Sequence, residues 1–376
     1  MASTSNPVTP TALSPRALGR ATLARQLLLR RTTMSVKDAV AHLVGLQAQN
    51  TRPPYYQLLA RLTDFDPAEL SALMASREVV RLVTLRSTIH THTADDALTL
   101  RPLVQAARER ELRAFRAGLV GVDLHRLAAV GRELVEERPR TPKELRASLL
   151  AEWPEADPRA LGVAARCVLP LVQVTPRGMW GRSGQVSLTT VEHWLGRDLL
   201  PVPAPDATVL RYLGAFGPAS VKDMQRWAGL TRLREVFERL RSRLITFRDE
   251  NGVELFDLPD APRPPEDTPA PPRFLPEFDN VLLGHADRTR IIPARYRGRN
   301  GNGNQSYGSV LVDGFLAALW RTDASGDGVT ATVQPLGTLG GTDRDAVIEE
   351  GLRTLATMTP KSTPDIRFGT FVDFSR

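Results

Sequence analysis

A short pattern that occurs three times constrains this chain of 376 residues more than any other feature. Segments 35–38, 141–144 and 220–223 read Ser-Val-Lys-Asp, Thr-Pro-Lys-Glu and Ser-Val-Lys-Asp. Each begins with Ser or Thr, a preferred helix N-cap, and places an acid in the first turn, where the helix dipole favours negative charge. Apolar residues at helical spacing follow, such as Val36 and Val40 in the first copy. The repeat therefore predicts three related units that open with a helix.

The stretches that follow the three openings share one predicted order of elements. A second helical stretch comes first, and two strand-like runs joined by a turn come after it. In the third copy Asn251-Gly252 lies between apolar runs at 244–247 and 253–256, which is a strong hairpin signal. Helix, helix and hairpin is the order of a winged helix, the helix-turn-helix variant with a β-wing. Chance recurrence of so short a pattern is the alternative, and the shared element order argues against it.

Proline-rich stretches divide the rest of the chain. Segment 259–276 has eight prolines in 18 residues, so it cannot form a helix or an interior strand. The first residues are rich in Ser, Thr and Pro and lack an apolar core, which predicts a disordered tail. The expected parts are a tail at 1–16, winged-helix units at 17–122, 123–198 and 199–260, and a Pro-rich linker with a β-rich domain at 261–376.

Short apolar runs with Gly and Asn turns fill the C-terminal part, among them 280–283 and 290–292. We expect these runs to be strands of a small barrel-like sheet, with one helix at 343–358. The predicted fold class is therefore α+β, with three tandem winged helices and a small barrel-like sheet in an overall C shape.

Composition limits the classes of partner and the cellular compartment that fit this chain. Lys plus Arg is 49 and Asp plus Glu is 42, so the net charge is +7, which favours nucleic acid over a membrane surface as the partner. Lys occurs at only four positions, and a GC-rich genome would also give this excess of Arg. Cys167 is the single cysteine, which excludes an intrachain disulfide and favours a reducing, cytoplasmic compartment. No apolar run approaches the ~18 residues that a membrane span needs.

Common catalytic motifs are absent from the sequence. It has no Gly-rich phosphate loop, no zinc-binding spacing and no Gly-x-Ser-x-Gly. His90 and His92 are two residues apart on a predicted strand, so they would face the same side. The simplest interpretation is an exposed strand face, because a metal site would need a third ligand. We therefore expect no metal, nucleotide, flavin or other cofactor.

Two glutamines stand out near the first repeat. A helix that begins at Ser35 cannot pass Pro53, and where its end runs into extended chain, residues two apart can point the same way. Gln47 and Gln49 can thus place two amides in one spot at an exposed helix terminus. The residues alone leave open that both glutamines merely cap the helix end and face solvent.

The segment Gly-Leu-Gln-Ala-Gln at 45–49 resembles the Gln-apolar-Gln motif of the bacterial winged-helix DNA glycosylases that unhook interstrand crosslinks, the AlkZ-like family. Segment 81–90 resembles the family's Arg-x-x-x-apolar-Arg-small-Thr-x-His strand, and 278–290 resembles its Asp-Asn-x-x-Leu-x-His-Ala-Asp-Arg hairpin. The resemblance covers nearly all of residues 20–375. A sister branch carries Asp at the second Gln position, so Gln49 fits the branch that gives an azinomycin B producer its self-resistance.

The resemblance implies a monofunctional DNA glycosylase in which Gln47 and Gln49 are catalytic. N7-alkylation gives a purine a positive charge, which makes it a good leaving group and moves the charge to the sugar as the bond breaks. Two amide carbonyl dipoles could stabilise that charge and orient a water. Gln cannot be a general base near pH 7. We therefore expect action on cationic N7- or N3-alkylpurines, crosslinks included, and none on uracil or 8-oxoguanine.

Duplex DNA is the expected partner of a protein that we expect to be monomeric. A crosslinked base is tethered to the other strand, so an open, basic groove fits better than a deep pocket. An ordinary surface or ion-pair role stays open for each of the arginines. The expected DNA contacts are Arg52, Arg81, Arg86 and His90 near the glutamines, Arg177 and Arg182 in the second wing, and His285, Arg288 and Arg290 in the late hairpin.

Two other functions fit part of the sequence. A winged-helix transcriptional regulator without catalysis would share the positive charge, but the chain is large for a simple repressor and shows no obvious dimerisation helix. A resistance protein that sequesters the free toxin is the second alternative, and an aromatic content of 6% argues weakly against it.

Overall fold

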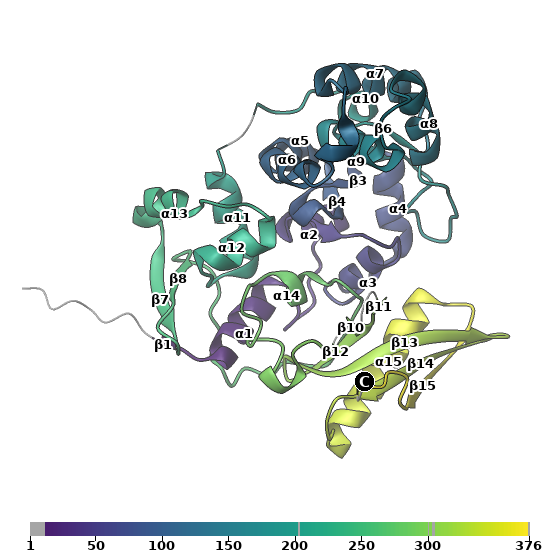
Figure 1. The fold of residues 1–376 in the computed structure, drawn as a ribbon. Coiled ribbons are helices and arrows are strands. Elements are labelled where there is room, and N and C mark those ends of the chain that lie inside the picture. Colours follow the sequence, from purple (N-terminus) through teal and green to yellow (C-terminus); the bar gives the residue numbers. More distant parts are fainter. Residues whose placement is uncertain (1–11, 202–203, 300, 303–304, 375–376) are drawn as a thin grey trace, which may run out of the picture.

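The computed structural model describes residues 12–201, 204–299, 301–302 and 305–374 (Figure 1). Its elements fall into four consecutive parts, which are three units of helices and strands and a C-terminal part. The first unit contains α1 (Pro15–Arg25), α2 (Val36–His42), β2 (Leu46–Gln47), α3 (Pro53–Leu59), α4 (Pro67–Ala75), β3 (Val79–Val83), the 3₁₀ turn η1 (Leu85–Ser87), β4 (Ile89–Thr93), α5 (Ala94–Leu103), α6 (Gln105–Arg113) and η2 (Arg116–Leu119). A two-residue strand, β1 (Ala12–Leu13), precedes it.

The second and third units repeat the predicted order of helices followed by an antiparallel strand pair. The second unit contains α7 (Leu124–Glu137), α8 (Pro142–Glu152), α9 (Pro158–Val168), β5 (Leu171–Gln173), β6 (Leu188–Thr190) and α10 (Val191–Leu195). The third unit contains α11 (Asp206–Phe216), α12 (Val221–Ala228), α13 (Arg234–Leu240), η3 (Arg241–Arg243), β7 (Ile245–Asp249) and β8 (Glu254–Asp257).

The C-terminal part is a sheet with one long helix packed against it. Its elements are β9 (Arg273–Leu275), α14 (Asn280–Leu283), η4 (Ala294–Tyr296), β10 (Gly301–Asn302), β11 (Gln305–Ser306), β12 (Gly308–Val312), β13 (Phe315–Ser325), β14 (Gly328–Pro335), α15 (Gly341–Met358) and β15 (Thr363–Phe368). The strand order is β15-β14-β13-β12-β9. In the described chain β9 and β15 are the two edges of this sheet and do not pair with each other. The sheet is therefore open, and the expected barrel-like closure is not observed.

The repeated pattern caps helices as predicted. The side chains of Ser35, Thr141 and Ser220 accept hydrogen bonds from the third backbone N–H of α2, α8 and α12. These contacts satisfy amide donors that a helix start otherwise leaves without partners. The prediction of three capped helices is therefore confirmed.

Two of the units share one sheet, which the sequence did not predict. Strand β3 pairs with β4 on one side and with β5 on the other, through Arg81↔Gln173 and Leu82↔Val172. The resulting order, β2-β4-β3-β5-β6, fuses the strands of the first and second units. The second and third units flank the first on two sides of the molecule (Figure 1).

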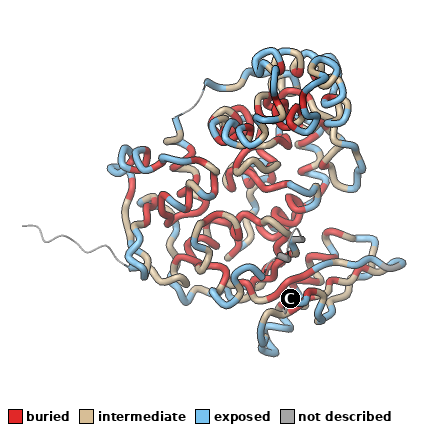
Figure 2. The backbone as a smooth tube through the Cα atoms, viewed as in Figure 1, coloured by how far each residue is buried: buried red, intermediate tan, exposed pale blue. Residues whose placement is uncertain are grey.

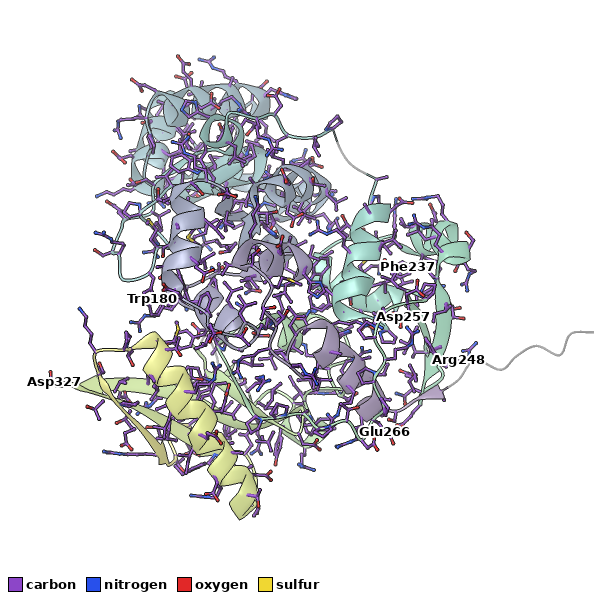
Figure 3. The ribbon with its side chains drawn as sticks, turned by 180° about the vertical axis from the view of Figure 1, so that it is seen from behind. Trp180, Phe237, Arg248, Asp257, Glu266 and Asp327 are labelled. Atoms are coloured by element: carbon purple, nitrogen blue, oxygen red, sulfur yellow. The ribbon has the colours of Figure 1, made fainter. Side chains whose placement is uncertain are left out.

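The third unit is attached to the first through a buried ion pair. The side chains of Arg25 in α1 and Asp257 in β8 are fully buried, and Arg25 Nη2 donates to Asp257 Oδ2 over 2.9 Å. Figure 3 labels Asp257 within the third unit. Figure 2 shows that buried positions continue through the regions where the units meet. Among the described residues, no helix has the length and apolar character required to cross a membrane.

Three local predictions were wrong. The expected strand at 290–292 is a turn, because the N–H groups of Ile291 and Ile292 both bond to the Arg288 carbonyl. Within the expected tail at 1–16, residues 1–11 lie outside the described part, but Ala12 and Leu13 form β1 in parallel with β7, and Ser14 caps α1. Strand pairing and capping fix these residues in place. The expected strand at 280–283 is helix α14, because the Asp279 side chain accepts a hydrogen bond from the Val281 N–H and starts a helical turn.

Candidate active site

A tight reversal after α2 places Gln47, the first glutamine of the motif, on strand β2, and Gln49 lies in the bend that follows. Val44 and Gly45 have positive φ values, +55° and +90°, and turn the chain from α2 into β2. A Cβ on Gly45 would lie 2.2 Å from the His92 ring, so the position requires glycine. The expected site for the motif was an exposed helix end. It lies instead at the edge of the shared sheet, where Gln47 pairs with His90 of β4.

The two glutamine side chains bond to the same short segment of chain. Gln47 Oε1 accepts a hydrogen bond from Arg86 Nη2 over 2.8 Å, and Gln49 Oε1 accepts one from the Ile89 N–H over 3.4 Å. Gln47 is 5% exposed, whereas Gln49 is exposed. The amides therefore converge on residues 86–89, with Gln49 open to solvent and Gln47 held beneath the surface.

Arg86 holds Gln47 in place from a strained backbone position. Arg86 and Ser87 have φ values of +53° and +58°, a conformation that non-glycine residues adopt at a cost of about 1–3 kcal/mol. Nη1 donates to the carbonyl of Trp227, the penultimate residue of α12, so the contact bridges two units. Burial, followed by the charges of Arg288 and Arg226, lowers the pKa of Arg86 to about 10.

His90 completes the contacts of Arg86 as a neutral ring. Its Nδ1 lies 3.0 Å from the Thr88 carbonyl, which only accepts, so Nδ1 carries the proton. Nε2 is then an acceptor 3.4 Å from Arg86 Nη2. Burial, with the positive charge of Arg86 and the nearby His92, lowers the pKa of His90 well below its usual value.

His92 stacks beside His90, with ring centroids 5.5 Å apart. Burial lowers the pKa of His92 to about 4. The prediction that the two rings face the same side is confirmed. The expected exposure was wrong, because His90 and His92 are 1% and 0% exposed.

Residues far away in the sequence brace the glutamine loop. Asn280 Nδ2 donates to the Gly45 carbonyl over 2.8 Å, and Gln57 Nε2 donates to the Gln47 carbonyl over 3.0 Å. Arg61 donates to the Gln57 carbonyl and forms a two-bond ion pair with Asp279, at 2.8 and 2.7 Å. Sequence reasoning missed Gln57, Arg61 and this role of the Asp-Asn pair, although the pair lies in the segment that resembles the family.

Segment 285–290 docks against the third unit and does not form the expected hairpin. His285 Nε2 donates to the Phe216 carbonyl over 2.9 Å, and Arg290 Nη1 donates to the Pro218 carbonyl over 2.8 Å. Burial lowers the pKa of His285 to about 3. Because His285 and Arg290 are 1% and 5% exposed, direct contact with DNA does not fit their position.

Arg81 also lies inside the protein. Its Nη2 donates to the carbonyl of Ala48, the residue between the two glutamines, over 2.9 Å. Burial lowers the pKa of Arg81 to about 10, and the charge of Arg177 adds to this effect. Burial argues against phosphate contacts for Arg81 and His90, and both side chains instead support the glutamine strand and its neighbours.

The other predicted basic residues reach the surface. Arg52 is exposed and lies 5.7 Å from the centre of the Trp180 ring, and Arg182 is exposed. Arg177 is half-buried and donates to the Gly184 carbonyl. Arg52 and Arg177 line a shared cavity of about 440 Å³. These three positions fit the predicted contact with an anionic partner.

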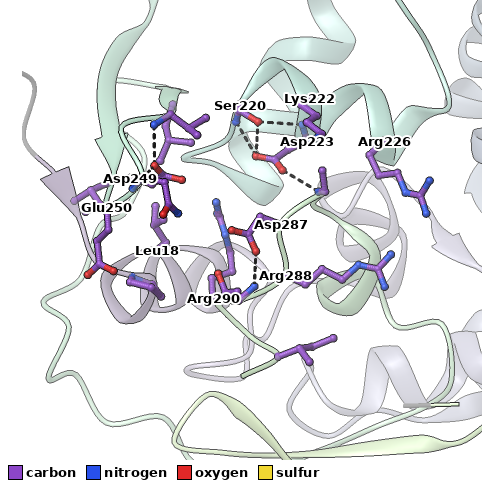
Figure 4. A pocket seen from close by; sticks show the side chains of 18 of the residues that line it. Leu18, Ser220, Lys222, Asp223, Arg226, Asp249, Glu250, Asp287, Arg288 and Arg290 are labelled. Carbon is purple, nitrogen blue, oxygen red and sulfur yellow. Dashed lines mark hydrogen bonds between the residues drawn. The ribbon is translucent and has the colours of Figure 1, made fainter. Parts of the chain in front are cut away.

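A second basic group adjoins Arg86. Arg288 and Arg226 line a cavity of about 810 Å³ between the third unit and the C-terminal part, and Figure 4 shows their side chains extending in the same direction. Arg226 was not predicted from the sequence. Neither side chain forms an ion pair or a hydrogen bond with a residue that the structure describes. Asp223 and Asp287 also line this cavity, but none of the three neighbouring arginines, Arg86, Arg226 and Arg288, forms an ion pair with an acid in the described part of the chain. Their charges favour an anionic ligand.

A separate cavity of about 320 Å³ begins at Gln49. Its walls come from the first unit, including Val83 and Ile89, and from α8, α9 and the wing of the second unit. Four arginines line it together with apolar side chains, and none of the described lining residues is acidic. Gln49 is therefore shared by the motif and by this cavity.

Comparisons with known proteins agree on one family. The sequence model of the family described as DNA glycosylase AlkZ-like matches residues 40–357. An interstrand DNA cross-link repair glycosylase of Streptomyces sahachiroi is 25% identical over 331 residues, covering 80% of this chain and 85% of the relative. The solved structure of Streptomyces sahachiroi DNA glycosylase AlkZ superposes with a TM-score of 0.79 at 21% identity and covers 96% of this chain and 100% of that chain.

The reversal at Gly45 provides a test of the site's construction. Gly45→Ala should lower the free energy of unfolding by more than Gly121→Ala, because only the first substitution drives a Cβ into the His92 ring. Gly121 has a similar φ of +75° and nothing within 4 Å of its added Cβ, so it measures the backbone cost alone. We expect about 1–2 kcal/mol for Gly121→Ala and at least about 1 kcal/mol more for Gly45→Ala in urea titrations. Equal losses would contradict the proposed contact.

Proposed function

The chain belongs to the DNA glycosylase AlkZ-like family, and we propose that it hydrolyses the N-glycosidic bond of cationic N7- or N3-alkylpurines in duplex DNA. Purines joined by an interstrand crosslink are included among these substrates. The biological role that fits this activity is DNA repair and self-resistance to a DNA-alkylating natural product. The crosslink-repair relative supports the proposed substrate class.

One observation carries the proposal. The side-chain oxygens of Gln47 and Gln49 bond to residues of the same segment of the first unit, 86–89. The amides come from residues two apart in the chain, Gln47 at the end of β2 and Gln49 in the bend that follows it. This arrangement supports a joint action of both glutamines on one substrate atom.

The chemistry follows from the charge of the substrate. Cleavage of the C1′–N9 bond sends the electron pair to the alkylated purine, which leaves as a neutral base, and leaves the positive charge on the sugar. Carbonyl dipoles near C1′ stabilise this charge, and a water that donates hydrogen bonds to the same oxygens is held for attack. The water oxygen bonds to C1′ and its proton passes to solvent.

The two glutamines contribute differently to this step. Gln49 is exposed at the cavity edge, so its oxygen can meet substrate and water directly. Gln47 Oε1 uses one lone pair for Arg86 and keeps a second for the water. Arg86 thereby acts as a positioning residue that fixes the direction of the Gln47 carbonyl.

The ionisable groups beside the glutamines suit a reaction without a general acid. His90 is neutral, its Nδ1–H is bound to the Thr88 carbonyl, and its Nε2 faces a cation. Protonation of the departing base is unnecessary because the alkyl group already supplies the charge.

Basic surface residues give the proposed path of the DNA backbone. Arg226 and Arg288 lie on the side of Arg86, and Arg52, Arg177 and Arg182 lie in the region of the second wing. Phosphates at these positions would offset charges that have no acidic partner near Arg86. Contacts of this kind bind the DNA backbone and do not require a base to be extruded into a deep pocket. They therefore suit a purine that a crosslink ties to the opposite strand.

Removing either amide should abolish excision while preserving binding. Gln47→Ala and Gln49→Ala should each lower the single-turnover release of N7-methylguanine from duplex DNA by about 10²–10³-fold, because each loses one oriented carbonyl. Strand breaks after alkaline treatment measure release, and a gel-shift titration measures binding. Gln185→Ala, at an exposed position of the second wing, is the control that should keep full activity. Full-speed release by both variants would remove the two glutamines from the reaction, whereas no release by the wild-type protein, with binding intact, would favour the non-catalytic regulator.

Phosphate contact predicts a change in salt dependence. Arg226→Gln and Arg288→Gln should each reduce the slope of log affinity against log salt by about one, because each removes one displaced counterion. Fluorescence anisotropy on an undamaged duplex measures the slope. Arg367→Gln on β15, where the arginine already pairs with Asp365, should leave it unchanged. A slope that stays constant in all three variants would remove these arginines from the DNA path.

A further inference from the structure

We infer that the cavity beside Gln49 binds the uncharged, apolar ring system of a bulky purine adduct, while the purine itself reacts outside at the two glutamines. This inference rests on the proposed function and adds a specificity site to it. The occupant is the substituent carried by the alkylated base, and its chemical class is a fused-ring aromatic group.

The size and lining of the cavity fit such a group. Its volume of about 320 Å³ is at the lower end of the range of small-molecule sites, which is about 300–1,000 Å³. Val83 and Ile89 of the first unit face Leu145, Val163 and Leu188 of the second across it. Apolar walls of this kind favour burial of an aromatic surface. Apart from the arginines, the polar side chains of the described lining are the neutral Gln49, Ser87 and Gln173.

The charges around the cavity exclude the cationic purine as occupant. Arg101, Arg146, Arg159 and Arg166 line it, and no described lining residue is acidic. A positively charged ring would enter a field of the same sign without a counterion, which is unfavourable in a partly desolvated site. The part of the substrate that enters must therefore be neutral, and the substituent is the part of a cationic adduct that meets this condition.

Two of these arginines are available to the DNA backbone. Arg101 donates to the carbonyls of Cys167 and Leu169, and Arg166 pairs with Glu111, so both have partners within the protein. Arg146 and Arg159 form no ion pair with any residue that the structure describes, although Arg159 lies 5.6 Å from the Phe115 ring centre. Phosphates beside the lesion can bind these two side chains while the substituent occupies the apolar interior.

The position of Gln49 links the cavity to the reaction. Gln49 lines the cavity and also bonds to Ile89, a second lining residue. A substituent on N7 that enters the cavity is thus attached to a purine lying beside the glutamines. The cavity selects for large adducts and helps to place the C1′ atom.

A glycine in the cavity wall offers a direct test. Gly162 lies in α9, and a Cβ added there would meet only the Arg146 side chain, at an ordinary contact distance of 3.5 Å. Gly162→Leu therefore fills the cavity without backbone strain. Ala151→Leu, at an exposed position of α8 in the same unit, adds an aliphatic side chain away from the cavity and is the matched control.

We expect Gly162→Leu to slow the single-turnover release of an N7-(naphthylmethyl)guanine by about tenfold or more, since a filled pocket discriminates by this magnitude. Release of N7-methylguanine should stay within about twofold, and Ala151→Leu should change neither rate. Val186→Phe, from the wing side of the same cavity, should reproduce the selective loss and guards against a folding defect in the first variant.

The outcomes separate this inference from the proposed function. Equal loss on both substrates in both cavity variants, or unchanged release of the bulky adduct, would overturn the cavity assignment while glutamine-dependent release of N7-methylguanine persists. If the wild-type protein released neither adduct, the proposed function itself would fail.

Discussion

The hydrogen bond from Arg86 to Gln47 is the contact on which the site depends. The guanidinium joins the glutamine strand to His90 of the shared sheet and to the end of α12, so it fixes the amide relative to two units at once. It does so without an acidic partner among the described residues, and Arg226 and Arg288 add charge of the same sign. Arg86, Arg226 and Arg288 therefore form a positively charged cluster, which phosphates of the DNA backbone would neutralise under the proposed function.

Long-range contacts give this small site its rigidity. The buried pair Arg61–Asp279 and the amide of Asn280 bring the C-terminal part under the glutamine loop. A second buried pair, Arg25–Asp257, holds the third unit against α1. Loss of one partner of a buried ion pair is costly because a charge is left without compensation, so the arrangement tolerates little displacement. The units thus hold β2, the strand that carries Gln47, in a fixed position.

Sequence reasoning succeeded where the signal is local. The caps at Ser35, Thr141 and Ser220 depend on neighbours three residues away, and the side shared by His90 and His92 depends only on strand periodicity. It failed where contacts with residues distant in the sequence determine the position of a side chain or the course of the backbone. Arginine is usually a surface residue, and the sequence therefore predicts that Arg81 and Arg290 are exposed. Both are buried, because their guanidinium groups donate hydrogen bonds to carbonyls of other segments, those of Ala48 and Pro218. The reversal at Gly45 depends on His92 and Asn280, which no local pattern indicates.

The central claim is that a pair of neutral amides suffices because the substrate brings its own positive charge. The most direct measurement compares single-turnover release of two bases from otherwise identical duplexes, N7-methylguanine, which is cationic, and 8-oxoguanine, which is neutral. The account predicts measurable release of the first and none of the second over the same period. Comparable release of both would require a group that protonates the departing base, and would contradict the assignment of the reaction to Gln47 and Gln49.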